Sequence, residues 1–314
     1  MIFLALVRAY FGFRPAGPYV VVNIPPGMTA SQAARLLKHK EVIAMPVLFR
    51  FAAKSSGLDR KLKPGSYRLQ KGMRLADLLR ALNSGPNNGV RVLIPEGFSA
   101  QQVADRLAAN GICSAADFLA IVKERRLEGY LFPTTYYLEP GSLADKVVRR
   151  MLDEFGRTIE AEFKAQQPPP KMTLHQLLTL ASIIEREAVL SQERPMIAAV
   201  YMNRLRKRMR LEADPTVQYA LGHWKKGLTL KDLRFSSPYN TYINYGLPPG
   251  PICSPSLDSF RAALRPAETQ AVYFVADTTG GHIFSSTFTE HLEAKKTLWR
   301  ARRELRRQAK RPNS

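Results

Sequence analysis

The segment from Thr173 to Glu187, TLHQLLTLASIIERE, constrains the fold more than any other part of the chain. Thr173 and Gln176 stand at the spacing of a capping box, in which each of the two side chains bonds the backbone of the other residue at a helix start. Apolar residues then recur at helical spacing, namely Leu174, Leu177, Leu178, Ala181 and Ile184. This pattern predicts an amphipathic helix with its apolar side buried in a core.

Two glutamates, Glu185 and Glu187, interrupt the end of this apolar run. Because they lie two residues apart, their side chains point in nearly opposite directions on a helix and cannot share one role. Glu187 lies on the more apolar side, above Leu180, where loss of hydration favours the protonated carboxyl that a general acid needs. The alternative is a solvated helix end at which the glutamates pair with Arg186 and Arg194.

The first part of the chain carries a repeated strand, turn and helix pattern. YVVVNIPPGMTASQAARLL begins at Tyr19, and VLIPEGFSAQQVADRL repeats it with Gly97 in place of Gly27; the alternative is chance similarity of common turns. The polar stretch SGPNNG at 84–89 indicates a linker. We therefore expect an α+β protein with small βα modules at 19–89, a mixed α/β domain at 90–300 and a basic tail at 301–314.

The charge balance restricts the possible partners. The chain has 47 Lys and Arg against 26 Asp and Glu, a net charge of +21, which predicts an anionic partner: a nucleic acid, an anionic membrane or a carboxylate-rich polymer. The sequence has no nucleic-acid reader motif, so we expect no nucleic-acid partner. The apolar start MIFLALV is shorter than the roughly 20 residues of a membrane span. Residues 1–18 are therefore either a core strand or a truncated membrane anchor.

Several kinds of chemistry lack their usual sequence support. There is no GxxxxGK[ST] loop, no GxGxxG, no GxSxG and no HExxH motif. The five histidines are scattered, and Cys113 and Cys253 are far apart in the sequence. We predict no metal and no cofactor. Acid catalysis by a carboxyl group on a glycosidic bond remains.

The loop that begins at Ser236, SSPYNTYINYGLPPGPICSPS, suits a sugar ligand. Tyrosine rings can cover the C–H faces of a sugar, while amides and hydroxyls bond its polar groups. Tyr239, Asn240 and Tyr242 are therefore candidates for substrate binding. Asp214 precedes a proline, and capping of the next helix is sufficient to explain it, with substrate binding as the alternative.

These segments together resemble the endolytic murein transglycosylases (YceG-like), membrane-anchored lytic enzymes of bacterial cell-wall synthesis. The resemblance rests on KPGSYRL (63–69), EGYLFPTTY (128–136), LASIIEREA (180–188), NRLRKRMRLEADPTVQY (203–219), SPYNTYINYGLPPGPICSP (237–255) and YFVADTTGGHIFS (273–285). One departure is the long N-terminal membrane helix of the family, which is missing here or reduced to MIFLALV.

The resemblance implies an activity and a location. Glu187 matches the family's catalytic acid, and 19–89 would be a LysM-like module. The enzyme would cleave the MurNAc–GlcNAc bond, leave 1,6-anhydro-MurNAc ends and terminate strand elongation. It would act on glycan strands on the periplasmic side of the inner membrane, anchored by its N-terminus and accompanied by cell-wall synthases.

Further residues are candidates for positioning the strand: Glu185, Asn203, Asp214, Tyr239, Asn240 and Tyr242. The alternative function is a non-catalytic peptidoglycan-binding protein, in which Glu187 only holds a helix in place.

Overall fold

The computed structural model describes residues 17–86, 89–225 and 227–308. The described chain divides into two compact units with the boundary between Arg91 and Val92, and Tyr137–Pro140 belong to the first unit. The predicted anchor at 1–18 lies, except for its last two residues, outside the described part. No helix in the described ranges has both the length and the apolar character needed to cross a membrane.

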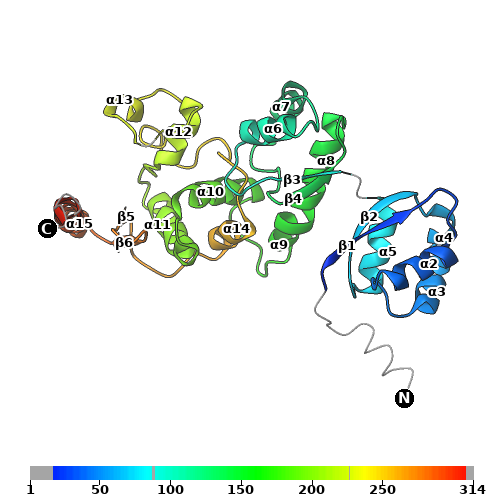
Figure 1. Ribbon diagram of the computed structural model, residues 1–314. Coiled ribbons are helices and arrows are strands. Elements are labelled where there is room, and N and C mark those ends of the chain that lie inside the picture. The colour runs from blue at the N-terminus through cyan, green and yellow to red at the C-terminus, as the bar shows by residue number, and fades with distance from the viewer. Residues whose placement is uncertain (1–16, 87–88, 226, 309–314) are drawn as a thin grey trace, which may run out of the picture. The chain divides into compact units, whose positions relative to one another are not determined.

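The first unit is a pair of strands covered by helices (Figure 1). Strands β1 (Tyr19–Ile24) and β2 (Gly65–Gln70) are antiparallel, with Tyr19 opposite Gln70 and Ile24 opposite Gly65. The helices are α2 (Ala30–His39), α3 (Pro46–Ser55), α4 (Leu58–Lys61) and α5 (Leu75–Ser84). The buried residues Val22, Ile24, Leu37, Phe49, Tyr67 and Leu78 belong to one core that these elements share.

The repeated strand, turn and helix pattern is visible in the backbone. Gly27 and Gly97 both adopt the left-handed conformation, with φ of +78° and +75°, which glycine tolerates without a steric penalty. Each turn leads into a helix that starts with a complete capping box, formed by Thr29 in one copy and by Ser99 in the other. The similarity in sequence therefore corresponds to a similarity in local structure.

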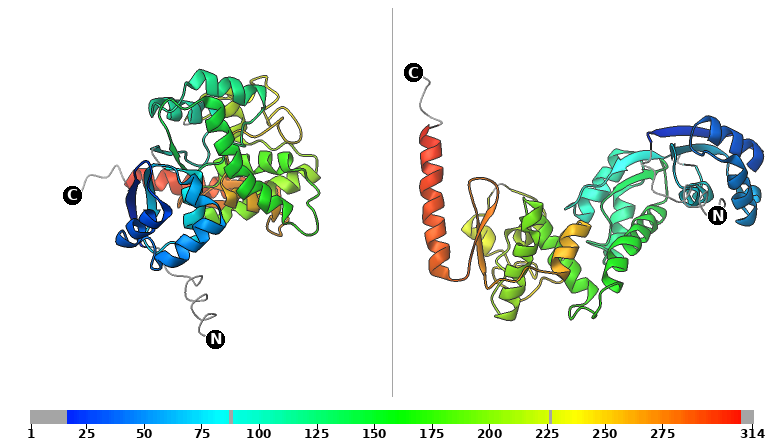
Figure 2. Two further views of the ribbon diagram at one scale, coloured as in Figure 1. Left: turned by 90° about the vertical axis from the view of Figure 1, so that its right-hand side faces the viewer. Right: turned by 90° about the horizontal axis from the view of Figure 1, so that it is seen from below.

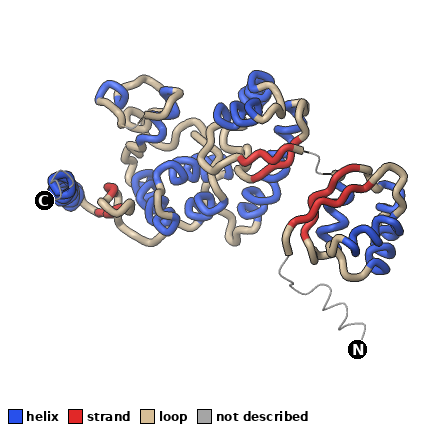
Figure 3. The backbone as a smooth tube through the Cα atoms, viewed as in Figure 1, coloured by secondary structure: helices blue, strands red, loops and turns tan. Residues whose placement is uncertain are grey.

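The division between the units falls within strands β3 (Val90–Leu93) and β4 (Thr135–Leu138), which pair with each other. Figure 3 shows that the strands form short pairs among many helices, so the fold is mixed α+β as predicted. The remaining elements are α6 (Ala100–Ala109), α7 (Ala115–Glu124), α8 (Ala144–Phe155), η1 (Gly156–Glu160), α9 (Ala161–Lys164), α10 (Leu174–Glu187), η2 (Ser191–Glu193), α11 (Arg194–Arg206), α12 (Asp214–Leu221), α13 (Leu230–Leu233), α14 (Leu257–Leu264), β5 (Tyr273–Ala276), β6 (His282–Ser285) and α15 (Phe288–Gln308).

Helix α10 is the centre of the second unit, and it starts with the predicted capping box of Thr173 and Gln176. It packs against α11 and α14, and every residue from 177 to 184 is buried. The helix is therefore covered on all sides instead of along one stripe. Its buried hydroxyls are bonded: Ser182 Oγ donates to the backbone of Thr179 and accepts from the N–H of Ile252.

The unit ends in the hairpin of β5 and β6, in which Tyr273 lies opposite Ser285, followed by the long helix α15 (Figure 2). Helix α15 packs against this hairpin. The predicted basic tail at 301–314 starts inside α15, and its last six residues lie outside the described part.

Candidate active site

Glu187 is the last residue of α10 and lines a cavity of about 300 Å³. Its Oε1 accepts a hydrogen bond of 2.9 Å from the hydroxyl of Tyr201, a buried residue of α11. The whole lining is Glu187, Tyr201, Arg204, Leu211, Glu212, Asp214, Tyr242, Phe274, His291 and Lys295. The cavity thus brings residues from α10, α11, α12, β5 and α15 around one carboxyl group.

Burial raises the pKa of Glu187 to about 7. The nearby carboxylate of Asp214 acts in the same direction, whereas the hydrogen bond from Tyr201 and the charge of Arg186 lower the pKa. A large fraction of the Glu187 side chains therefore carries a proton at neutral pH. A carboxyl that both holds and releases a proton in this range can act as acid and then as base.

Two of the predicted substrate-binding residues, Asp214 and Tyr242, line the same cavity as Glu187. The hydroxyl of Tyr242 donates a 2.6 Å hydrogen bond to Oδ1 of Asp214. The prediction that Asp214 caps α12 is wrong. Ala213 occupies the capping position, and Asp214 is the first residue of the helix, with its carboxylate bonded to Tyr242.

Glu185 does not line this cavity. Its Oε2 accepts hydrogen bonds from the backbone N–H of Ser256, at 2.9 Å, and from the hydroxyl of the same residue. Its Oε1 lies 3.5 Å from Nη2 of Arg194, and only 7% of the Glu185 side chain is exposed. Because Ser256 caps α14, Glu185 connects the end of α10 to the start of α14. Its assignment to substrate binding stays a prediction.

The amide of Asn203 is used inside the protein. Its Nδ2 donates to the carbonyls of Thr269 and Ala271, at 2.9 and 2.8 Å, and its Oδ1 accepts from Arg206. These bonds fix the chain in front of β5 to α11. Asn203 is not among the residues that line the Glu187 cavity, and its assignment to substrate binding stays a prediction.

Asn240 is fully buried and orders the loop in which it lies. Its Nδ2 donates to the carbonyls of Leu233 and Phe235, and its Oδ1 accepts from the N–H of Tyr242. Asn240 therefore acts on the Glu187 cavity through the placement of Tyr242. Tyr239 lies elsewhere, in the wall of a second cavity.

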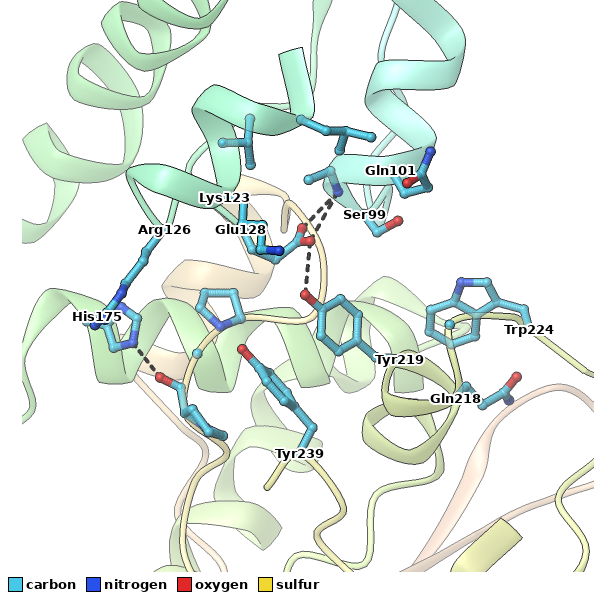
Figure 4. A pocket seen from close by; sticks show the side chains of 17 residues that line it. Ser99, Gln101, Lys123, Arg126, Glu128, His175, Gln218, Tyr219, Trp224 and Tyr239 are labelled. Atoms are coloured by element: carbon cyan, nitrogen blue, oxygen red, sulfur yellow. Dashed lines mark hydrogen bonds between the residues drawn. The ribbon is translucent and has the colours of Figure 1, made fainter. Parts of the chain in front are cut away.

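The second cavity is larger, about 730 Å³, and lies beside Glu128 (Figure 4). Both oxygens of Glu128 accept from the N–H of Ala100, at 2.9 and 3.2 Å, and Oε2 accepts from the hydroxyl of Tyr219 at 3.2 Å. Burial outweighs these bonds and raises the pKa of Glu128 to about 7. The next residue, Gly129, has φ of +84°, and a Cβ there would lie 2.7 Å from Cγ of Pro251.

The sequence interpretation did not single out Glu128, Tyr201 or His291 as site residues. Tyr219 and Glu128 lie 91 positions apart in the chain, so no local spacing relates them. Tyr201 stands in an apolar run whose spacing indicates only a core helix. His291 is 7% exposed, and its Nδ1 has no hydrogen-bond partner among the described residues.

The two glutamates with raised pKa values predict how stability depends on pH. In the folded protein Glu128 and Glu187 hold their protons up to about pH 7, whereas the ordinary pKa is 4.5. The folded state therefore binds more protons than the unfolded state between these values, and the free energy of unfolding falls as pH rises through this interval. Urea unfolding between pH 4.5 and 7.5 measures this fall. It should be smaller in Glu128→Gln, and an equal slope in that variant would contradict the assignment.

Among the described residues, no group of three or more His, Cys, Asp and Glu side chains is placed to hold a metal ion.

The known proteins to which this chain is similar all point to the same family. The model of the YceG-like family matches residues 22–297. The chain is 35% identical over 303 residues to an endolytic murein transglycosylase of Bacillus subtilis (strain 168), a match that covers 88% of this chain and 84% of that protein. It is 30% identical over 339 residues to an endolytic murein transglycosylase of Streptococcus pneumoniae serotype 2, which covers 90% of this chain and 61% of that one.

A solved structure is also similar. The crystal structure of a yceG-like protein from Listeria monocytogenes superimposes with a TM-score of 0.60 at 36% sequence identity, covering 88% of this chain and 99% of that one.

Proposed function

The chain belongs to the YceG-like family, and we infer that it is an endolytic murein transglycosylase, a lyase that cuts peptidoglycan strands internally. The observation that carries the chemistry is the carboxyl of Glu187, which keeps its proton near neutral pH in the wall of a cavity. The similarity to curated transglycosylases over most of the chain supports the same activity.

We propose that Glu187 first acts as the acid. Its proton goes to the oxygen of the MurNAc–GlcNAc bond, and the bond between this oxygen and C1 of MurNAc breaks. The resulting carboxylate then takes the proton of the 6-hydroxyl of the same muramic acid, whose oxygen bonds to C1. The products are a free GlcNAc hydroxyl and a 1,6-anhydro-MurNAc end.

One carboxyl group is enough for this sequence. Most glycosidases use a second carboxylate, as a base that activates water or as a nucleophile. Here the attacking oxygen belongs to the substrate, and its closeness to C1 replaces a bimolecular step. Asp214 and Tyr242, bonded to each other in the same cavity, are placed to orient the muramic acid.

We further propose that residues 19–89 are a LysM-like module that holds the glycan, supported by the separate core of the first unit. The chain would work on the periplasmic side of the inner membrane, beside the cell-wall synthases, and would end strand elongation. Its net charge of +21 suits carboxylate-rich strands. Fractionation of cells that express the chain tests the location: recovery in the cytosol alone would contradict it.

The test of the activity is the mass of the products released from purified sacculi. A transglycosylase yields anhydro-muropeptides, which are lighter by one water than the products of hydrolysis. The non-catalytic alternative, a peptidoglycan-binding protein, would be retained on sacculi without releasing products. Release of hydrolytic products alone would contradict the proposed mechanism.

The hydroxyl of Tyr201 should set the pH range of the activity. Its hydrogen bond favours the charged form of Glu187 and so lowers the pKa of this carboxyl. In Tyr201→Phe the pKa rises, and the basic limb of the profile of kcat against pH moves upward by about one pH unit, the equivalent of one hydrogen bond to a charged group. Tyr242→Phe is the matched control, because the hydroxyl of Tyr242 is bonded to Asp214 instead. An unmoved basic limb in Tyr201→Phe would exclude Glu187 as the titrating acid.

A further inference from the structure

We propose that the cavity beside Glu128 is a second binding site for the glycan strand. This cavity holds an amino sugar that carries an acidic substituent, while another sugar of the same strand lies at Glu187. The proposal rests on the function inferred above. It assigns a ligand to the larger of the two cavities, which the cleavage chemistry does not use.

The walls of this cavity suit the faces of a sugar ring. Figure 4 shows the ring of Tyr219 between His175 on one side and Trp224 on the other, with its hydroxyl directed at Glu128. The ring of Tyr239 lies next to that of Tyr219, with their centroids 4.9 Å apart and their planes at 50°. Flat rings with polar tips, grouped around a hollow, cover C–H faces and bond hydroxyls at the edge.

The carboxyl group of Glu128 fits a ligand that combines hydroxyls with a negative charge. Because burial raises the pKa of Glu128 to about 7, a large fraction of the group is neutral at physiological pH. A neutral carboxyl repels an anionic ligand less than a carboxylate does, and it can still donate and accept hydrogen bonds.

The rim of the cavity supplies positive charge. Lys123 and Arg126 line the cavity, are exposed and form no ion pair with any described residue, whereas the adjacent Arg125 pairs with Asp145 at 3.0 Å. These two unpaired cations can meet carboxylates of the stem peptide, or the lactyl carboxylate of a muramic acid that has lost its peptide.

The backbone conformation of Arg126 makes glycine a suitable replacement in a test of the site. Arg126 follows the end of α7 in the left-handed conformation, with φ of +54°, where glycine is the usual residue because a side chain is disfavoured. An arginine here carries a conformational cost that glycine would avoid. Arg126→Gly therefore removes the side chain from the cavity lining without straining the backbone.

The two cavities lie at opposite ends of α12. Asp214, its first residue, lines the Glu187 cavity, whereas Gln218 and Tyr219 line the Glu128 cavity. The eight residues of α12 span about 12 Å at 1.5 Å per residue. One loop likewise supplies Tyr242 to the first cavity and Tyr239 to the second. A continuous strand along α12 can therefore occupy both.

Arg126→Gly in the full chain carrying Glu187→Gln tests the site, because the second change prevents cleavage during the measurement. The probe is peptidoglycan strands released from sacculi by an endopeptidase, and calorimetry measures the affinity. We expect roughly tenfold weaker binding, the factor that corresponds to one hydrogen bond to a charged group. The melting temperature should stay the same or rise, since glycine relieves the backbone at this position.

Arg208→Gly is the matched control. Arg208 is also exposed and left-handed, with φ of +53°, at the end of α11, and it lines neither cavity. This variant removes the same charge and should bind strands within twofold of the parent. An amidase that removes the stem peptides from the probe also frees the carboxylate of each lactyl group. The treatment should reduce the difference between the two variants if Arg126 contacts the peptide, and should keep or increase it if Arg126 contacts the lactyl group; both agree with the proposal.

Trp224→Ala tests the aromatic wall without removing a charged residue, and it should weaken the binding of both probes. With Glu187 intact, Arg126→Gly should raise KM for long strands and leave kcat within twofold. Equal affinity in the parent, Arg126→Gly and Trp224→Ala would overturn the second site, and so would a loss of kcat at constant KM. Failure of the intact chain to release anhydro ends would instead overturn the function itself.

Discussion

Replacement of Glu187 by glutamine is expected to lower kcat for the release of anhydro ends by about 10²- to 10⁴-fold, the range that a general acid contributes. Glutamine has nearly the same shape as glutamic acid but no transferable proton. The hydroxyl of Tyr201, which lies 2.9 Å from Oε1 of Glu187, can donate to the amide oxygen in the same way. The fold around α10 should therefore persist, and so should the affinity for strands.

The measurement is a time course of anhydro-muropeptides from purified sacculi, together with thermal unfolding of both proteins. The melting temperature should be unchanged or slightly higher, because the glutamine removes a group that titrates inside the protein. Loss of activity through unfolding would not test acid catalysis. Binding of strands by Glu187→Gln shows that the variant is folded and excludes unfolding as the cause of the loss. Retained activity in a folded variant would show that another group supplies the proton.

Replacement of Glu185 by alanine is expected to lower the free energy of unfolding by about 3 kcal/mol, the lower end of the cost of removing one partner from a buried ion pair. The change leaves Arg194, whose side chain is only 12% exposed, without its carboxylate. It also removes Oε2, the acceptor of both hydrogen bonds from Ser256, so the start of α14 loses these two bonds to the end of α10.

Urea unfolding measures this loss as a lower midpoint at an unchanged slope. Ser256→Ala is the control within the same cluster, since it removes one donor and the helix cap but leaves the ion pair. The two changes should be less than additive when combined, because both break the same hydrogen bond. A loss below about 1 kcal/mol in Glu185→Ala, the worth of a surface pair, would contradict this role.

These two predictions assign catalysis to Glu187 and stability to Glu185, two residues apart in the chain. Their opposite directions follow from helix geometry, and the capping box at Thr173 fixes where the helix starts, so this part of the prediction could be made from sequence. The roles of the other candidates depend on which partners surround them. Asn203 and Asn240 have the residue type of a sugar-binding amide, yet the folded chain uses their amides to hold backbone carbonyls.

Glu128, in contrast, could not be predicted from the sequence as a site residue. Its segment, EGYLFPTTY, supports the family resemblance, but nothing in it indicates a proton-holding carboxyl. Burial raises the pKa of Glu128 and outweighs the hydrogen bonds from Ala100 and Tyr219, which lower it. These two partners come from α6 and α12 and meet Glu128 only after folding. The role of Asp214 also could not be predicted from sequence. An acid followed by a proline is typical of a helix cap, and only the fold shows that this carboxylate accepts a hydrogen bond from Tyr242.

Because Gly129 lies against Pro251, the residues that position 129 tolerates depend on the residue at position 251. A library randomised at position 129 alone should return almost only glycine, because the ring of Pro251 leaves no room for a methyl group and φ is positive. A library that also varies position 251 gains space but keeps the backbone restriction. Anyone who grafts the Glu128 cavity onto another scaffold has to transfer both loops together.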